Sequence, residues 1–104
     1  MFVNLTPHTI HLPNGEEIAP SGVLARCEEE SEVAFVVDGV PVVFRRYGAV
    51  HDLLPERAGH WLIVSHMCRV ACPERMDLLS PGDLTRDEAG RITGCTNMVA
   101  NPWG

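Results

Sequence analysis

The sequence predicts a β-rich α+β fold: a single small domain with a mostly antiparallel sheet, open or barrel-like, and one or two short helices. Residues 32–48 read EVAFVVDGVPVVFRRYG, and Asp-Gly between β-branched runs is a strong signal for a two-residue hairpin. Most other apolar runs are short and alternate with polar residues, as in half-buried strands. The chain has 104 residues, 45% of them hydrophobic, which fits one domain over residues 1–104.

The N-terminal third reads as short strands separated by turns. Strands are predicted at residues 2–6, 9–12 and 23–27, and the PNG sequence at 13–15 predicts a tight turn. The EEES sequence at 28–31 is predicted to be a solvated acidic loop.

The arms of the 32–48 hairpin are almost continuously apolar, which is typical of strands that are covered on both faces. We therefore expect this hairpin at the centre of the sheet. Pro41 leaves one position near the turn without a ladder donor. Residues 49–60 are predicted to form an irregular loop.

The segment from residue 61 predicts a strand that leads into a short helix. WLIVS at 61–65 is apolar and branched, and Ser65 is placed to cap a helix over 66–72. Three apolar side chains at i, i+3 and i+4 are expected to face the sheet: Met67, Val70 and Ala71. Pro73 ends this helix and can open a second helical turn over 73–79.

The C-terminal segment predicts a closing hairpin over residues 83–100. Gly90 is expected at a positive φ in its turn, and Cys95 in its return strand. Trp103 lies near the end of the chain and is expected to pack on its own domain or on a second subunit, which favours a homo-oligomer.

The charge composition limits the classes of partner. The net charge is −6 and all eight basic side chains are arginine, so the chain lacks the basic face that non-specific nucleic-acid binding requires. No apolar run is long enough for a membrane helix, and the N-terminus does not resemble a signal peptide. We expect a cytoplasmic protein with reduced thiols.

Cys68 and Cys72 lie at i, i+4 on the predicted helix. Their Cβ atoms would be about 5–6 Å apart, which is too far for a disulfide. Two thiolates at this spacing can share a zinc ion, but the usual Cys-x₂-Cys spacing is absent. Packing in or near the core is the simpler interpretation of both residues.

Ser65 stands between a strand and a helix, where a nucleophile elbow places its serine. Val64 and His66 replace the glycines that such an elbow needs, and no cysteine has a recognisable histidine partner motif. Capping accounts for Ser65 without catalysis, so we predict that the protein is not an enzyme and needs no cofactor.

Anion binding is the sharper hypothesis. The helix start beside Ser65 offers free N–H groups, and converging guanidinium groups would complete a pocket for a carboxylate or phosphate. The candidate ligand-binding residues are Ser65, His66, Arg45, Arg46, Arg69, Arg75 and His8. The alternative is that these arginines form ordinary ion pairs, such as Arg75 with Asp77 or Glu74.

Five blocks in the chain occur in a familiar order: NLTPH at 4–8, YGAV with LLP within 47–55, IVS at 63–65, PERMDLLSPG at 73–82 and RDEAGRITGC at 86–95. Together they resemble a family of short, uncharacterised proteins of bacteria and their phages, over nearly the full length. The resemblance implies a standalone, phage- or prophage-associated domain. It implies no activity and no catalytic residues.

These observations predict a small non-catalytic binding protein that takes a nucleotide-like anion or a host protein. Two other classes stay open. One is a zinc-binding structural module that uses Cys68 and Cys72. The other is a small hydrolase or thiol enzyme that depends on Ser65 or Cys68.

Overall fold

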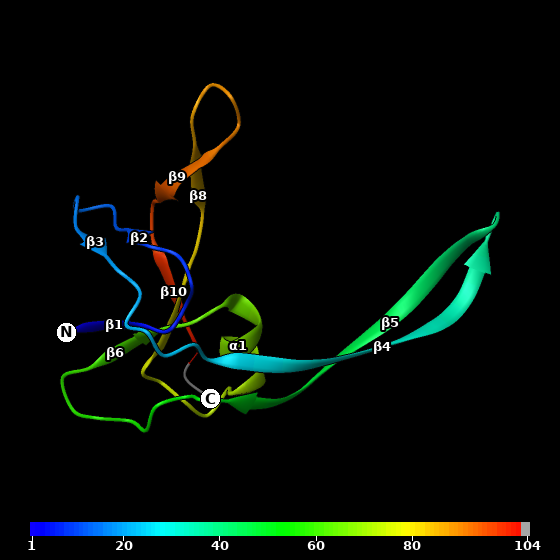
Figure 1. Ribbon diagram of the computed structural model, residues 1–104, viewed down its shortest axis with the longest axis horizontal. Coiled ribbons are helices and arrows are strands. Elements are labelled where there is room, and N and C mark those ends of the chain that lie inside the picture. Colours follow the sequence, from blue (N-terminus) through cyan, green and yellow to red (C-terminus); the bar gives the residue numbers. More distant parts are fainter. Residues whose placement is uncertain (103–104) are drawn as a thin grey trace.

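The computed structural model describes residues 1–102 (Figure 1). Its central sheet has four short strands in the order β1–β6–β7–β10. These strands are β1 (Phe2–Asn4), β6 (Trp61–Ile63), β7 (Leu78–Pro81) and β10 (Met98–Ala100). β6 is parallel to both β1 and β7, whereas β10 is antiparallel to β7. Parallel neighbours need a crossover, and the helix α1 (His66–Ala71) supplies it between β6 and β7.

A small core forms where α1 packs on this sheet. The fully buried side chains that cluster there are Leu5, Leu62, Val64, Cys68 and Leu78. The buried strand predicted at 61–65 is observed as the shorter β6, and residues 62–64 are between 0 and 2% exposed, whereas Trp61 is 44% exposed. Cys68 is a core residue, as its packing interpretation required.

The helix begins at its predicted cap, where Ser65 Oγ accepts a hydrogen bond from the Cys68 N–H at 3.3 Å. The face predicted to pack on the sheet is wrong. Cys68 and Arg69 are buried instead, while Met67 and Val70 are 40% and 52% exposed. Six residues are less than two turns, so their apolar spacing alone does not fix which side meets the sheet.

The second helical turn predicted at 73–79 is also wrong. Residues 73–77 form turns, and Leu78 begins strand β7. β7 pairs with β6 on one side and with β10 on the other, so its backbone groups are satisfied by two ladders that no local pattern reveals.

Two strands of twelve residues, β4 (Arg26–Val37) and β5 (Val40–His51), form a long hairpin that projects from the domain (Figure 1). We call residues 26–51 the arm. The predicted Asp-Gly turn is confirmed, with φ of 48° at Asp38 and 78° at Gly39. Because the arm projects, the Cα radius of gyration is 16.0 Å, against about 13 Å for a compact chain of this length.

Three expectations about the arm are wrong. It is not covered on both faces at the centre of the sheet, because most of its side chains are exposed. The acidic segment 28–31 is part of β4 rather than a loop, and residues 49–51 extend β5. Continued pairing along both strands carries these polar residues into the ladder.

Two smaller hairpins complete the described chain. β2 (Ile10–His11) pairs with β3 (Glu17–Ile18), and β8 (Leu84–Arg86) pairs with β9 (Ile92–Cys95). Gly90 has the predicted positive φ, 81°, and Cys95 lies in the return strand. Residues 98–100 leave this hairpin and join the central sheet as β10. The contact predicted for Trp103 falls outside the described residues.

The predicted β-rich α+β class is confirmed, with mostly antiparallel pairing and one short helix. Within residues 1–102 the strands form one four-stranded sheet and three two-stranded ones, with no closed barrel. The helix in this part of the chain is too short to cross a bilayer.

Candidate functional site

The predicted anion-binding residues are distributed over the molecule. Arg45 and Arg46 lie midway along β5 in the arm, where their side chains are more than half exposed. Each forms an ion pair with the opposite strand: Arg45 with Glu29 at 3.2 Å and Arg46 with Glu32 at 3.5 Å. Neither arginine lies at the start of α1.

Arg69 is buried and joins the helix to the end of the chain. Its Nε donates to Ser80 Oγ at 2.8 Å, and its Nη1 donates to Asn101 Oδ1 at 3.0 Å and to the Ala100 carbonyl at 3.4 Å. Its Nη2 lies 3.1 Å from His66 Nδ1. His66 and Arg69 are thus brought together, but the Arg69 donors already have protein acceptors.

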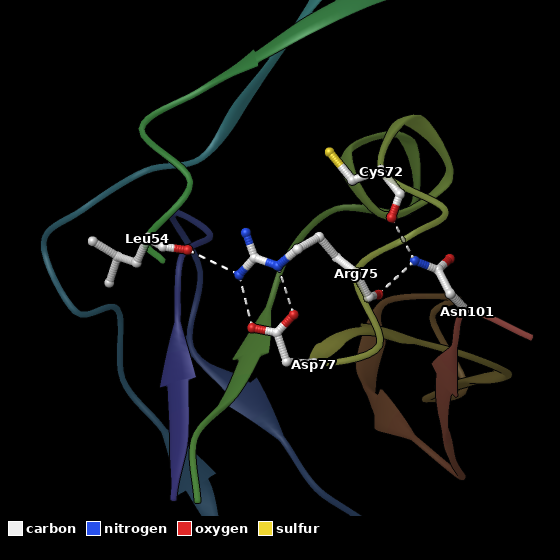
Figure 2. Close-up of polar contacts among 5 residues, drawn as sticks. All are labelled: Leu54, Cys72, Arg75, Asp77 and Asn101. Carbon is white, nitrogen blue, oxygen red and sulfur yellow. Dashed lines mark hydrogen bonds and ion pairs between the residues drawn. The ribbon is translucent and has the colours of Figure 1, made fainter. Parts of the chain in front are cut away.

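Arg75 holds a second polar network together (Figure 2). Its Nε and Nη2 donate to the two carboxylate oxygens of Asp77, each at 2.8 Å, and Nη2 also donates to the Leu54 carbonyl at 2.9 Å. Asn101 Nδ2 donates to the carbonyls of Cys72 and Arg75, both at 2.9 Å. This network fastens the loop after β5, the end of α1 and the C-terminal segment to one another.

The Arg75–Asp77 pair is the ion pair that the sequence offered as the alternative to anion binding. Its charge-assisted hydrogen bonds lower the pKa of Asp77 below the ordinary value of 3.8 and raise the pKa of Arg75. The Asp77 side chain is only 7% exposed, so the guanidinium of Arg75 is already bound by a buried carboxylate of the protein itself. The anion-binding role predicted for these arginines stays a prediction.

His8 lines a separate cleft of about 400 Å³ between β2 and the β8–β9 hairpin. Its lining combines His8 and His11 with apolar side chains that include Ile10, Leu84 and Ile92. No arginine or carboxylate lines it among the described residues, so its chemistry suits a small, largely apolar ligand better than an anion.

The cysteines are free thiols. Cys27 and Cys72 pack against the core cluster that contains Cys68, and burial raises the pKa of the Cys27 and Cys72 thiols. A raised pKa disfavours the thiolate that both metal binding and nucleophilic attack require. Within residues 1–102, no three His, Cys, Asp or Glu side chains group around a possible metal position.

The outer part of the arm has an unusual surface, and we call this part the tip and define it as residues 33–44. Seven of its large apolar side chains are between 41 and 62% exposed: Val33, Phe35, Val36, Val37, Val40, Val43 and Phe44. Opposed residues on an antiparallel pair share a face. The Phe35–Val42 pair lies on one face and the Val33–Val43 pair on the other. The tip is therefore apolar on both faces.

The sequence signal for this surface is the almost continuous apolar run within residues 32–48. An apolar run without alternation does indicate strands covered on both faces. In this structure the described part of the chain does not provide the cover.

The part of the arm nearer the domain is different. Charged side chains replace the apolar ones over residues 28–32 and 45–46, and the inner end packs on the core through Cys27 and Val50. A shallow hollow of about 320 Å³ lies on one face, lined by Glu30, Ser31, Glu32, Phe44 and Arg46. The arm thus has an anchored base, a charged middle and an apolar tip.

Compared with protein-family models, with curated proteins and with solved structures, this chain matches none.

Proposed function

We propose that this is a non-catalytic protein-binding domain that uses its arm to hold another protein chain. One observation carries the proposal: the tip is apolar on both faces and is exposed on both faces. Contiguous exposed apolar patches on soluble proteins mark interaction sites. A hairpin that is apolar on one face only would pack that face on a single surface. A hairpin that is apolar on both faces is suited to lie between two surfaces.

The energetics of the hairpin support this proposal. An isolated two-stranded hairpin is at best marginally stable in water. Covering a half-exposed valine or phenylalanine contributes about 1 kcal/mol, and the tip holds seven such side chains. A partner that covers both faces would therefore stabilise the arm and gain binding energy from the same contact.

Between the two kinds of ligand that the sequence favoured, these contacts favour a protein over a small anion. Arg69 and Arg75 are engaged by buried acceptors, and Arg45 and Arg46 project from the arm beside carboxylates. The resemblance to short bacterial and phage proteins stays a prediction, and it makes a host protein one class of partner.

Photo-crosslinking in the cells that naturally produce the protein tests this function. A photo-reactive phenylalanine analogue at position 44, in the tip, should give discrete covalent adducts with another chain. The matched control is the same analogue at position 92 in β9, because Ile92 and Phe44 are similarly exposed, at 58% and 56%. Adducts from position 44 that do not exceed those from position 92 would refute the proposal.

The rival anion hypothesis has its own readout. Stabilisation of the wild-type protein by a nucleotide in a thermal-shift assay, lost in R45Q or R46Q, would move the function from the tip to these arginines. We expect no such stabilisation.

A further inference from the structure

The two strands of the arm carry opposite charges in the middle of the hairpin. β4 presents Glu29, Glu30 and Glu32, whereas β5 presents Arg45 and Arg46 directly across from this segment. Glu30 and Arg46 share one face, and Glu29 lies on the other face with Arg45. The arm is thus acidic along one side and basic along the other, on both of its faces.

Both sides of the arm are open edges. β4 and β5 pair with each other, and neither pairs with a further strand within the described chain. Twelve residues span roughly 40 Å, so each edge offers a long row of backbone donors and acceptors. Proteins normally shorten, cover or pair such edges.

A second copy of the chain can meet these edges in two ways. A two-fold arrangement places β4 beside β4, or β5 beside β5, and so sets glutamates against glutamates or arginines against arginines. A head-to-tail arrangement places β4 of one copy beside β5 of the next and sets opposite charges side by side on both faces. Opposite charges on neighbouring strands stabilise a sheet and like charges destabilise it.

We propose that the arm binds a second copy of this chain head-to-tail, with the β4 edge of one copy paired to the β5 edge of the next. The hairpins then point the same way and continue one antiparallel sheet. This inference rests on the proposed protein-binding function and names the partner. A second copy supplies both complementary edges at once, and its own tip lies beside the first, so that the apolar side chains of neighbouring tips lie side by side on each face of the continued sheet.

A head-to-tail contact uses two different surfaces of each copy. It therefore closes into a ring when the rotation between copies allows, and otherwise grows into a filament. Pro41 lies opposite Val36, the second pair from the turn, which points its backbone groups outward in a two-residue hairpin. This proline removes one outward donor from the β5 edge, so we place the new pairing along the middle of the arm rather than at the turn.

The test is the mass of the assembly in solution, measured by light scattering on a size-exclusion column. One variant, E30R/E32R, reverses the β4 side; the other, R45E/R46E, reverses the β5 side. We expect at least twice the mass of one chain for the wild-type protein and the mass of one chain for each variant alone. An equal mixture of the two variants should regain the wild-type mass, because each reversed side then meets its complement.

The matched control, E16R/E17R, makes the same charge change at the start of β3 and should keep the wild-type mass. Circular dichroism checks that each variant is folded. If a double variant does not fold, the single variants E30R and R46E replace the two double variants in the same mixing experiment. A wild-type protein that runs as one chain overturns the proposal, and so does a mixture that stays at the mass of one chain.

The failure of this inference is distinct from failure of the proposed function. A monomeric wild-type protein whose position 44 crosslinks to a different protein overturns self-association and leaves the protein-binding function standing. A monomeric protein without specific adducts removes both.

Discussion

The core and the arm of this protein use similar residues under opposite conditions. Val64 in the core is 0% exposed, whereas Val36 in the arm is 61% exposed. Arg69 in the core donates to three protein acceptors, whereas Arg46 in the arm faces solvent beside Glu32. Residue type thus decides whether a strand needs its side chains covered from water. The fold decides whether the same chain provides that cover.

The same comparison separates structural residues from those available for function. Side chains in the core have their partners within the chain, so their substitution should lower the free energy of unfolding. Side chains in the arm have few partners within the chain, so their substitution should change association with another chain and leave the free energy of unfolding nearly unaltered. Four matched pairs of variants measure this difference, each in chemical denaturation at concentrations where the chain is monomeric.

The largest difference is expected for arginine. R69L should lower the free energy of unfolding by about 3–4 kcal/mol, because it leaves Ser80 and Asn101 with buried polar atoms that have lost their donor. R46L in the arm should cost less than about 0.5 kcal/mol, since its ion pair is exposed. Equal costs at the two positions would contradict the division between core and arm.

Valine gives the next largest difference. V64A removes two methyl groups from the buried cluster and should cost roughly 2–3 kcal/mol, including the cavity that it leaves. V36A makes the identical change at an exposed position and should stay within about 0.5 kcal/mol. A V36A cost as large as that of V64A would mean that the arm is covered within the monomer.

Acid should weaken the core network by protonating Asp77. The folded-state pKa of Asp77 lies below its ordinary value of 3.8, so its ionised form stabilises the fold above about pH 4. This stabilisation, about 2 kcal/mol from a charge-assisted pair, is lost as the pH falls through the folded-state pKa.

Denaturation curves measured between pH 7 and pH 2 test this loss. D77N should lower stability at pH 7 and should flatten the fall at low pH, because the titrating group is gone. R46Q in the arm should leave the curve of stability against pH unchanged to within about 0.5 kcal/mol. An unchanged acid response in D77N would show that another group dominates it.

The smallest difference is expected for serine. S65A removes the acceptor that caps α1 and should cost about 1 kcal/mol. S31A in the exposed middle of the arm serves as its control and should be nearly neutral. A neutral S65A would mean that packing of Cys68, and not the cap, holds the start of the helix.

Local chemistry made several features predictable. The Asp38–Gly39 turn, the turn at Gly90, strand β6 and the Ser65 cap all depend on residues within a few positions of one another. Turn geometry and capping use short-range hydrogen bonds, so a short stretch of sequence contains the information that they need.

Other features depend on pairs that lie far apart in the chain. β1 pairs with β6 across more than fifty residues, and the acceptors of Arg69 at Ala100 and Asn101 are about thirty residues away. The set of candidate anion-binding arginines failed to converge for the same reason. The Arg75–Asp77 pair is local and could be predicted from the sequence. Nothing local shows that Arg69 already has acceptors, or that Arg45 and Arg46 lie on a projecting hairpin.

The sequence by itself determined a β-rich fold and a hairpin whose apolar strands require cover on two faces. Only the tertiary structure decided that residues 1–102 do not supply this cover. The four-stranded sheet and α1 bury a core that the arm joins through its base alone, so the tip is left exposed. Apolar surface is driven out of water whether the neighbour comes from the same chain or from another, and the sequence pattern is the same in both cases.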